Sequence, residues 1–271
     1  MEFGTGANGA LWKIGYAEVT AKDPVYIVEN DSVGVCVYRL DAEYHPTAEE
    51  LGHDRERLAV IAFGEPEAVL AELSRVRETY PEIARISTSV DVLEAMTPEE
   101  REAWGPNWGF GWDFFWSDQP LAPVPGSESV RFIPSTEAAE VRDELEEILL
   151  QANPITDALN NIDKLDWYVI DQEDGSPAAV VGTHVIDGPD GISMVHFKGL
   201  GTLPELRGRG YGSALMVGAI NKALEEHDLI QFGMWSWNDN ARRMYGRVGI
   251  QHGGGIINGS PVPFPEITDE N

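Results

Sequence analysis

One segment, from Gly199 to Ser213, constrains the fold of this chain more than any other. It reads Gly-Leu-Gly-Thr-Leu-Pro-Glu-Leu-Arg-Gly-Arg-Gly-Tyr-Gly-Ser: an extended run ends at a proline turn, and a basic glycine-rich loop leads into a helix. The first N–H groups of a helix have no intrahelical acceptor, and the helix dipole favours negative charge beside them. Glycines at 208, 210 and 212 let an anion approach the backbone closely. The segment therefore predicts an anion site at a helix N-terminus.

Two common phosphate-binding loops do not match this segment. A Walker A loop needs a Gly-Lys-Ser/Thr ending, which is absent here. The dinucleotide fingerprint Gly-x-Gly-x-x-Gly fails because Ser213 stands where its third glycine belongs. The anion is therefore expected to belong to another kind of phosphate-containing ligand.

Arg207-x-x-Gly210-x-Gly212 resembles the acyl-CoA signature of the GNAT superfamily of N-acetyltransferases, [Gln/Arg]-x-x-Gly-x-[Gly/Ala]. Downstream, the run from Trp237 to Ile250 resembles the family's Asn-x-x-Ala-x-x-x-Tyr-x-x-x-Gly-Phe ending. The matching positions are Asn238, Ala241, Tyr245 and Gly249. Ile250 replaces the usual Phe, which is a hydrophobic exchange. The resemblance covers roughly Val130 to the C-terminus, about half of the chain.

The resemblance implies that acetyl-CoA is the cofactor and assigns roles to individual residues. The backbone of the loop would hold the CoA pyrophosphate, with charge-assisted bonds from the two arginines. The preceding strand would pair with the pantetheine arm, and the family opens that strand with a bulge, which the glycines at 199 and 201 would tolerate. The implied cofactor-binding residues are Leu200, Gly201, Thr202, Arg207, Gly208, Arg209, Gly210, Tyr211, Gly212, Ser213, Asn238 and Asn240.

Tyr245 and His196 are the candidate catalytic residues. Tyr245 stands at the family's general-acid position; its alternative role is a ring packed on the sheet. In several family members a Glu occupies the strand position of His196 and acts as general base; the histidine here differs in residue type, but an imidazole with a pKa near 6.5 suits that task. A structural, hydrogen-bonded histidine is the alternative for His196, and His184 is a second candidate base. The histidines and Cys36 show no metal-ligand spacing, so no metal is expected.

Composition restricts the partners. The formal net charge of −27, from 46 acidic and 19 basic residues, argues against nucleic acid and anionic membranes as partners. It suits a cationic substrate, although solubility alone also explains it. A single cysteine, Cys36, is consistent with a reducing cytosol, and no secretory signal or membrane-length apolar run is visible. A cytoplasmic protein is therefore expected.

A proline-rich stretch, residues 117–127, predicts a linker between two halves. Residues 1–126 are expected to form an N-terminal α+β domain, a degenerate GNAT-like half of the kind found in actinobacterial members, and residues 127–271 the GNAT domain. The pattern before the linker predicts strands at Val25–Glu29, Val33–Leu40, Leu58–Phe63, Ile83–Ser87 and Trp108–Trp116, and helices at Pro66–Tyr80, Val90–Met96 and Pro98–Trp104.

The segment after the linker predicts an α+β fold with a mixed, mostly antiparallel sheet flanked by helices. Strands are expected at Arg131–Ile133, Leu165–Asp171, Ala178–Asp187, Ile192–Leu203, Leu229–Trp235 and Ile250–Ile257. Helices are expected at Thr136–Gln151 (with Ser135 as N-cap), Gly210–Glu226 and Asn238–Arg247 (with Asn238 as N-cap). This order is the one that the GNAT resemblance implies.

An aromatic run in the first half alternates with period two at Trp108, Phe110, Trp112 and Phe114. The alternation predicts one buried strand face, packed in a core or between domains, and a role in shaping an acceptor pocket is the alternative.

Three functions follow from the resemblance. The first is transfer of an acetyl group from acetyl-CoA directly to a primary amine of a small molecule. The second is a catalytically inactive acyl-CoA-binding module, and the third is acetylation of protein lysines or N-termini. The expected partner is a small-molecule amine, and a homodimer is one option for assembly.

Overall fold

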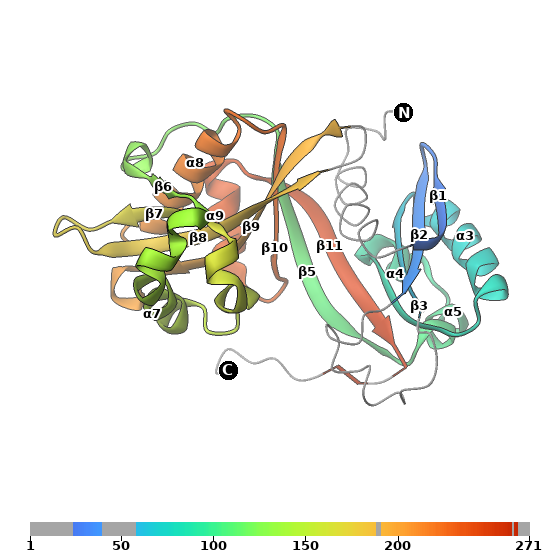
Figure 1. The fold of residues 1–271 in the computed structure, drawn as a ribbon. Coiled ribbons are helices and arrows are strands. Elements are labelled where there is room, and N and C mark those ends of the chain that lie inside the picture. Colours follow the sequence, from blue (N-terminus) through green and yellow to red (C-terminus); the bar gives the residue numbers. More distant parts are fainter. Residues whose placement is uncertain (1–23, 40–57, 188–190, 262, 265–271) are drawn as a thin grey trace. The chain divides into compact units, whose positions relative to one another are not determined.

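The computed structural model describes residues 24–39, 58–187, 191–261 and 263–264 (Figure 1). Leu40, the predicted end of the second strand, lies outside these ranges. The described chain forms two compact units. Unit 1 takes in the described residues up to Phe114, Met234–Trp237, and the described residues from His252 onward. Unit 2 takes in the described residues of 115–233 and Asn238–Gln251. Each unit combines a sheet with helices, which confirms the predicted α+β class.

Unit 2 contains the predicted anion loop. Its sheet has the strand order β10-β9-β8-β7-β6. The strands are β6 (Arg131–Ile133), β7 (Asp166–Asp171), β8 (Pro177–Asp187), β9 (Ser193–Thr202) and β10 (Leu229–Trp235, whose last two residues belong to unit 1). The helices are α6 (Ser135–Ala138), α7 (Arg142–Ala152), α8 (Tyr211–Ala223) and α9 (Asp239–Val248), with 3₁₀ turns η1 (Ser127–Ser129), η2 (Ala139–Val141), η3 (Asp157–Lys164) and η5 (Pro204–Leu206).

Helix α8 follows β9 and leads into the parallel strand β10, because parallel strands need a crossover. Its residues from Ala214 to Ile220 are all buried, as its nearly all-round apolar sequence predicts. Asn221 at the far end of α8 binds the linker, accepting from the Leu121 N–H (2.7 Å) and donating to the Leu121 carbonyl (3.0 Å). The linker is therefore fixed to unit 2.

The β8–β9 ladder contains the predicted bulge. Val180 pairs with Gly201 and Gly182 with Lys198, so two β9 residues, Gly199 and Leu200, stand opposite one β8 residue. Gly199 has φ +67°, and a Cβ atom there would lie 2.7 Å from the Cβ of Ala158. Glycine is therefore required at 199 both by the left-handed backbone and by the neighbouring turn.

Unit 1 has a sheet in which β1-β2-β3-β4-β11-β5 are successive neighbours. Its strands are β1 (Pro24–Glu29), β2 (Val33–Arg39), β3 (Leu58–Gly64), β4 (Ile83–Ser89), β5 (Asn107–Ser117, whose last three residues belong to unit 2) and β11 (Gln251–Ser260, whose first residue belongs to unit 2). Its helices are α3 (Pro66–Thr79), α4 (Val90–Ala95) and α5 (Pro98–Trp104). Strands β3 and β4 are parallel and connected by α3, so unit 1 also contains a β-α-β segment.

The predicted helix over 136–151 is wrong in its continuity and in its cap. It is divided into α6, η2 and α7, and Pro134, not Ser135, is the N-cap residue. The Asp166 carboxylate accepts a hydrogen bond from the Ser135 N–H at 2.7 Å. A side chain from β7 thus caps the helix start, a contact that no local sequence pattern reveals.

The prediction of one buried aromatic face on β5 is also wrong. Phe114 is buried, but Trp108, Phe110 and Trp112 are only half-buried. Phe110 has φ +50°, the only positive φ of a non-glycine residue in the described ranges, and this breaks the alternation of faces. Phe110 and Trp112 both contact Trp235, with ring centroids 5.4 and 3.9 Å apart.

Candidate functional site

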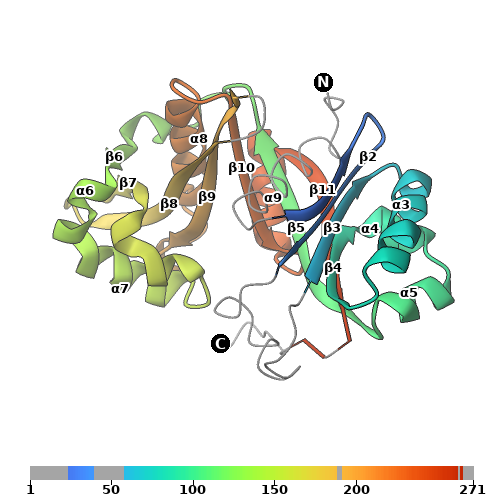
Figure 2. The ribbon, with the colours of Figure 1, turned by 45° about the vertical axis from the view of Figure 1, so that its right-hand side comes forward.

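The parallel ladder between β9 and β10 ends early. Leu229 pairs with Met194, Ile230 with Val195, and Gln231 with His196, while residues 197–202 of β9 have no register partner on β10 in the described structure. The two strands diverge beyond this point (Figure 2). On its other edge β9 stays paired with β8 as far as Thr202. The edge of β9 facing β10 therefore leaves backbone groups available to an extended ligand.

The loop that follows β9 presents free N–H groups. Within the described residues, the backbone N–H groups of Gly208, Gly210, Tyr211, Gly212 and Ser213 have no hydrogen-bond acceptor. Gly208 and Gly210 have φ +77° and +95°, and a Cβ atom at either would meet nothing within 4 Å. The donors therefore lie on an open surface of left-handed backbone at the N-terminus of α8, which fits an anionic group such as a pyrophosphate.

The two arginines of the loop differ in their contacts. The Arg207 guanidinium donates to the carbonyl oxygens of Thr202 (3.3 Å, from Nε) and Ala152 (3.0 Å, from Nη2), so it ties the loop to the C-terminal end of α7. Arg209 is exposed and has no side-chain partner in the described part of the chain. Arg207 thus positions the loop, and Arg209 is available to a ligand.

Two polar side chains lie at the last register pair before the split. Gln231 is fully buried, and neither its Oε1 nor its Nε2 has a hydrogen-bond partner among the described residues. The Nδ1 atom of His196 is likewise buried and unpartnered there. His184 pairs with His196 on the next strand, with ring centroids 5.2 Å apart. The predicted base therefore lies in a polar row across β8, β9 and β10.

Burial lowers the pKa of His196 to about 4, and the Lys198 ammonium lowers it further, while a polar side-chain contact with Gln231 and the charge of Asp157 raise it. Lys198 itself forms an ion pair with Asp157 at 2.7 Å. His196 is therefore neutral at pH 7, and the unpartnered Nδ1 is the nitrogen in a position to accept a proton.

Tyr245 projects from α9 into an aromatic cluster of unit 2. Its ring lies 5.0 Å from that of Phe115 and 4.8 Å from that of Phe232. The residue is 4% exposed, and burial raises the pKa of its phenol. The described residues offer its hydroxyl no hydrogen-bond partner. The ring of the predicted acid is therefore packed among other aromatic rings, while its hydroxyl has no described hydrogen-bond partner.

Tyr245 and His196 lie on opposite faces of the unit 2 sheet. Successive side chains of a strand point to opposite faces, so Phe232 and its neighbour Gln231 are separated in this way. Tyr245 packs on Phe232, whereas Gln231 pairs with His196. Phe197, the neighbour of His196, lies 6.5 Å from Phe232 and shares the face of Tyr245. The candidate base and acid thus flank the split from its two sides.

Three other predicted cofactor-binding residues, Asn238, Asn240 and Leu200, already make hydrogen bonds within the protein. Asn238 caps α9, as expected, by accepting from the Ala241 N–H at 3.1 Å. The Asn240 amide oxygen accepts from Arg243 at 2.6 Å, so that residue is engaged within its own helix. The Leu200 carbonyl accepts from the Asn153 side chain at 3.3 Å, which supports the bulge from the α7 side.

Gln231 is the site residue that sequence reasoning missed. The available signal was a glutamine inside an otherwise apolar strand, Leu-Ile-Gln-Phe-Gly-Met-Trp. A polar residue at a core position of a strand is unusual unless it is hydrogen-bonded or functional.

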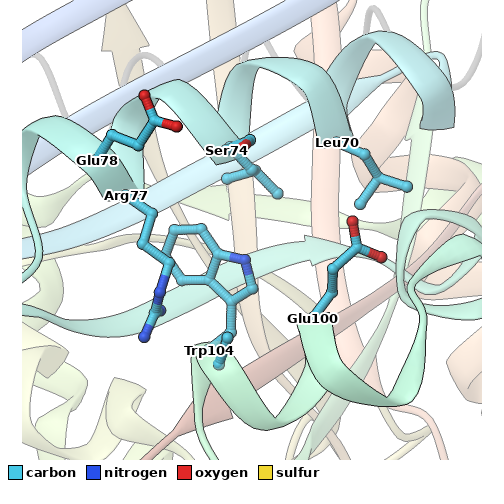
Figure 3. A pocket seen from close by; sticks show the side chains of 8 residues that line it. Leu70, Ser74, Arg77, Glu78, Glu100 and Trp104 are labelled. Atoms are coloured by element: carbon cyan, nitrogen blue, oxygen red, sulfur yellow. The ribbon is translucent and has the colours of Figure 1, made fainter.

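A separate hollow lies in unit 1 between α3 and α5 (Figure 3). Trp104 forms part of its wall, and the Arg77 guanidinium lies 5.1 Å from the Trp104 ring centre. It contains none of the predicted site residues. Within the described ranges, no group of three or more His, Cys, Asp or Glu side chains could hold a metal ion, and no helix is long and apolar enough to span a membrane.

Comparisons with known proteins agree with this geometry. Residues 134–250 match the family model described as Acetyltransferase (GNAT) family. A GCN5-related N-acetyltransferase from Kribbella flavida has a similar structure, at 16% identity and a TM-score of 0.51, covering 96% of this chain and 97% of its own. An acetyltransferase of the GNAT family from Colwellia psychrerythraea is similar at 12% identity and a TM-score of 0.52, covering 92% and 88%. No curated protein matches the chain.

Proposed function

Because residues 134–250 are a GNAT-family acetyltransferase domain, we propose that this protein transfers the acetyl group of acetyl-CoA directly to a primary amine of a small molecule. The observation that carries the proposal is the split between β9 and β10, which begins at His196 and Gln231 and leads to the free N–H groups of Gly208 and of residues 210–213. An anion held by those N–H groups would place an extended thioester arm along the free edge of β9.

Acetyl-CoA would supply the acetyl group as a thioester. The amine nitrogen forms a bond to the carbonyl carbon and the carbon–sulfur bond breaks. The nitrogen loses one proton and the departing thiolate gains one. The products are an acetamide and the free thiol of CoA, and no other reactant is required.

His196 takes the proton from the nitrogen in this proposal. Its low pKa makes it a weak base, so it cannot deprotonate a free ammonium effectively. It is suited to accept the proton once bond formation to the carbonyl carbon has made that N–H acidic. The neutral imidazole is present throughout the pH range in which free amines are available.

Tyr245 serves the leaving sulfur. Because burial raises its pKa, the phenol stays protonated and acts first as a hydrogen-bond donor to the developing thiolate. Complete transfer of its proton to the thiolate is uphill, because the thiol that forms has a pKa of only about 8.5, so transfer has to accompany carbon–sulfur cleavage. A base on one face and an acid on the other fit a nucleophile and a leaving group on opposite sides of the reacting carbon.

Thermal unfolding with acetyl-CoA tests the binding part of this proposal. A ligand that binds only the native state stabilises it by about 2.7 kcal/mol at a hundredfold excess over Kd. Arg209→Glu should abolish the shift without changing the melting temperature of the free protein, because Arg209 has no described side-chain partner. Arg207→Ala should lower the melting temperature even without ligand, because it frees the two carbonyls of Thr202 and Ala152.

Release of CoA in the presence of a panel of small primary amines tests the reaction. Binding without release for any small amine, but with release for lysine-containing peptides, would favour protein acetylation. Binding without release for either class would favour an inactive binding module. Absence of a thermal shift in the wild-type protein would contradict the proposal itself.

A further inference from the structure

The buried carboxamide of Gln231 has one polar neighbour in the described structure, the His196 imidazole, and this contact accounts for at most one of its two polar atoms. A buried amide that lacks hydrogen bonds costs about 1–3 kcal/mol of stability. The side chain is fully buried, neither polar atom has a partner at hydrogen-bond distance and angle, and the weaker contact with the His196 imidazole leaves the Nε2 donor unused. Its neighbours on β10, Ile230 and Phe232, are apolar and buried, as expected for a core strand. Unsatisfied groups of this kind are retained where a ligand or a water completes them.

The position of Gln231 indicates what kind of ligand atom it meets. It lies at the closed end of the split, paired in register with His196, whereas the anion loop follows the open end of β9. Strand residues rise about 3.3 Å each, so His196 is about 20 Å along β9 from Thr202. A thioester arm that is anchored at the loop and follows this edge directs its acyl end towards Gln231.

The chemistry of a carboxamide suits the acyl end. Its Nε2 is a hydrogen-bond donor, and the thioester carbonyl oxygen is an acceptor that gains negative charge as the amine attacks. Its Oε1 is an acceptor, and the attacking amine carries an N–H donor to the same point as the acyl carbon. In a buried site such a hydrogen bond is stronger than in water.

We propose that Gln231 is a catalytic residue whose Nε2 donates a hydrogen bond to the acyl carbonyl oxygen at the closed end of the β9–β10 split. This inference rests on the proposed function, because it presumes an acyl-CoA in the split. It adds a recognition element for the acyl group that is independent of the identity of the amine.

Binding measurements with one CoA thioester and one matching CoA thioether isolate this contact. Acetyl-CoA has the carbonyl, and S-ethyl-CoA has a CH₂ group in its place. Wild-type protein should bind acetyl-CoA roughly 2- to 10-fold more tightly than S-ethyl-CoA, the value of one such hydrogen bond. Gln231→Met, which keeps the side-chain length and removes the donor, should bind both equally, with unchanged affinity for S-ethyl-CoA.

A matched control and a stability measurement complete the test. Gln251 is exposed, and Gln251→Met should keep the wild-type preference. Free Gln231→Met should melt no lower than the wild type, because it loses an unsatisfied buried group. A preference that survives in Gln231→Met would overturn the inference while leaving the proposed function intact. If wild-type protein binds neither analogue, the proposed function itself fails.

A measurement on the wild-type protein alone covers the case in which Gln231→Met does not fold. Infrared difference spectra of bound acetyl-CoA, carrying ¹³C at the thioester carbonyl, should show that C=O stretch at lower wavenumber than in solution. A band at the solution position would overturn the inference.

Discussion

The two β-α-β segments of this protein, β3-α3-β4 in unit 1 and β9-α8-β10 in unit 2, have the same local arrangement and different ladders. In the first, parallel pairing continues from Leu58 to Ala62, close to the end of β3. In the second, pairing stops at His196 and leaves residues 197–202 of β9 free on that edge. We call the first segment closed, because its two parallel strands stay paired almost to the end of β3, and the second open, because its strands lose their pairing partway along β9.

The first turns of α3 and α8 also differ in whether they carry acidic side chains. Helix α3 begins after Glu65 and carries Glu67 in its first turn, so two carboxylates stand where an anion would have to bind. Helix α8 begins after Gly210 and has no acidic residue in its first turn. Because a helix N-terminus is positive in both cases, the side chains decide whether it is neutralised internally or left for a ligand.

The last register pairs show the contrast most directly. In unit 1 this pair is Ala62 and Thr88, and the Thr88 hydroxyl donates to the Ala62 carbonyl at 2.7 Å. In unit 2 it is His196 and Gln231, whose buried polar atoms include three without a described partner. The last pair of the β3–β4 ladder is joined by a side-chain hydrogen bond, whereas the last pair of the β9–β10 ladder has buried polar atoms without one at normal geometry. The likeness of residues 1–126 to a degenerate GNAT half stays a prediction.

Removal of the Tyr245 hydroxyl should have the largest effect. Tyr245→Phe is expected to lower the rate of CoA release with the best amine of the panel by about 10²-fold or more, the contribution of a positioned acid, with unchanged acetyl-CoA affinity. Tyr168→Phe is the matched control, since Tyr168 is also buried in unit 2 and its pKa is likewise raised by burial, to about 12. Equal rates for wild type and Tyr245→Phe would show that Tyr245 is not the general acid.

The next largest effect concerns pH and stability. His196 has a folded pKa of about 4 and an ordinary value of 6.5, so between these pH values the unfolded chain binds a proton that the native protein does not. The free energy of unfolding should fall by at most about 3 kcal/mol as pH drops through this window, and this contribution is fully present above pH 6.5. His196→Gln should flatten the decline in chemical denaturation, whereas Thr88→Val in the closed ladder should leave its slope unchanged.

A third substitution makes the open turn resemble the closed one. Ser213→Glu places a carboxylate in the first turn of α8, as Glu67 is placed in α3. Acetyl-CoA affinity, measured by calorimetry, should fall by at least about tenfold, while the free protein should gain about 0.3–1 kcal/mol or remain unchanged. Glu67→Ser should not alter the affinity. Retention of wild-type affinity by Ser213→Glu would show that the ligand is not held at this helix end.

Much of the fold follows from local patterns in the sequence. Arg131–Ile133 and Leu229–Trp235 are strands at the predicted residues, and the other strands match to within a few residues, because apolar alternation and turn residues are local signals. Asn238 caps α9 as predicted, since an N-cap is specified within four residues. Among the predictions that are wrong, the Ser135 cap depends on a distant carboxylate and the β5 aromatic face on the strained backbone at Phe110, while the predicted 136–151 helix is divided into α6, η2 and α7.

The sequence by itself determined the strand–loop–helix of the anion site, the helix that carries Tyr245, and the GNAT resemblance, because each is specified by residues adjacent in the chain. Only the tertiary structure decided that the β9–β10 ladder ends at His196, that Gln231 faces that point, and that Arg207 holds the loop to α7. These features depend on register and contacts between segments far apart in sequence. Such contacts are set by packing of the whole unit, for which a linear pattern carries no signal.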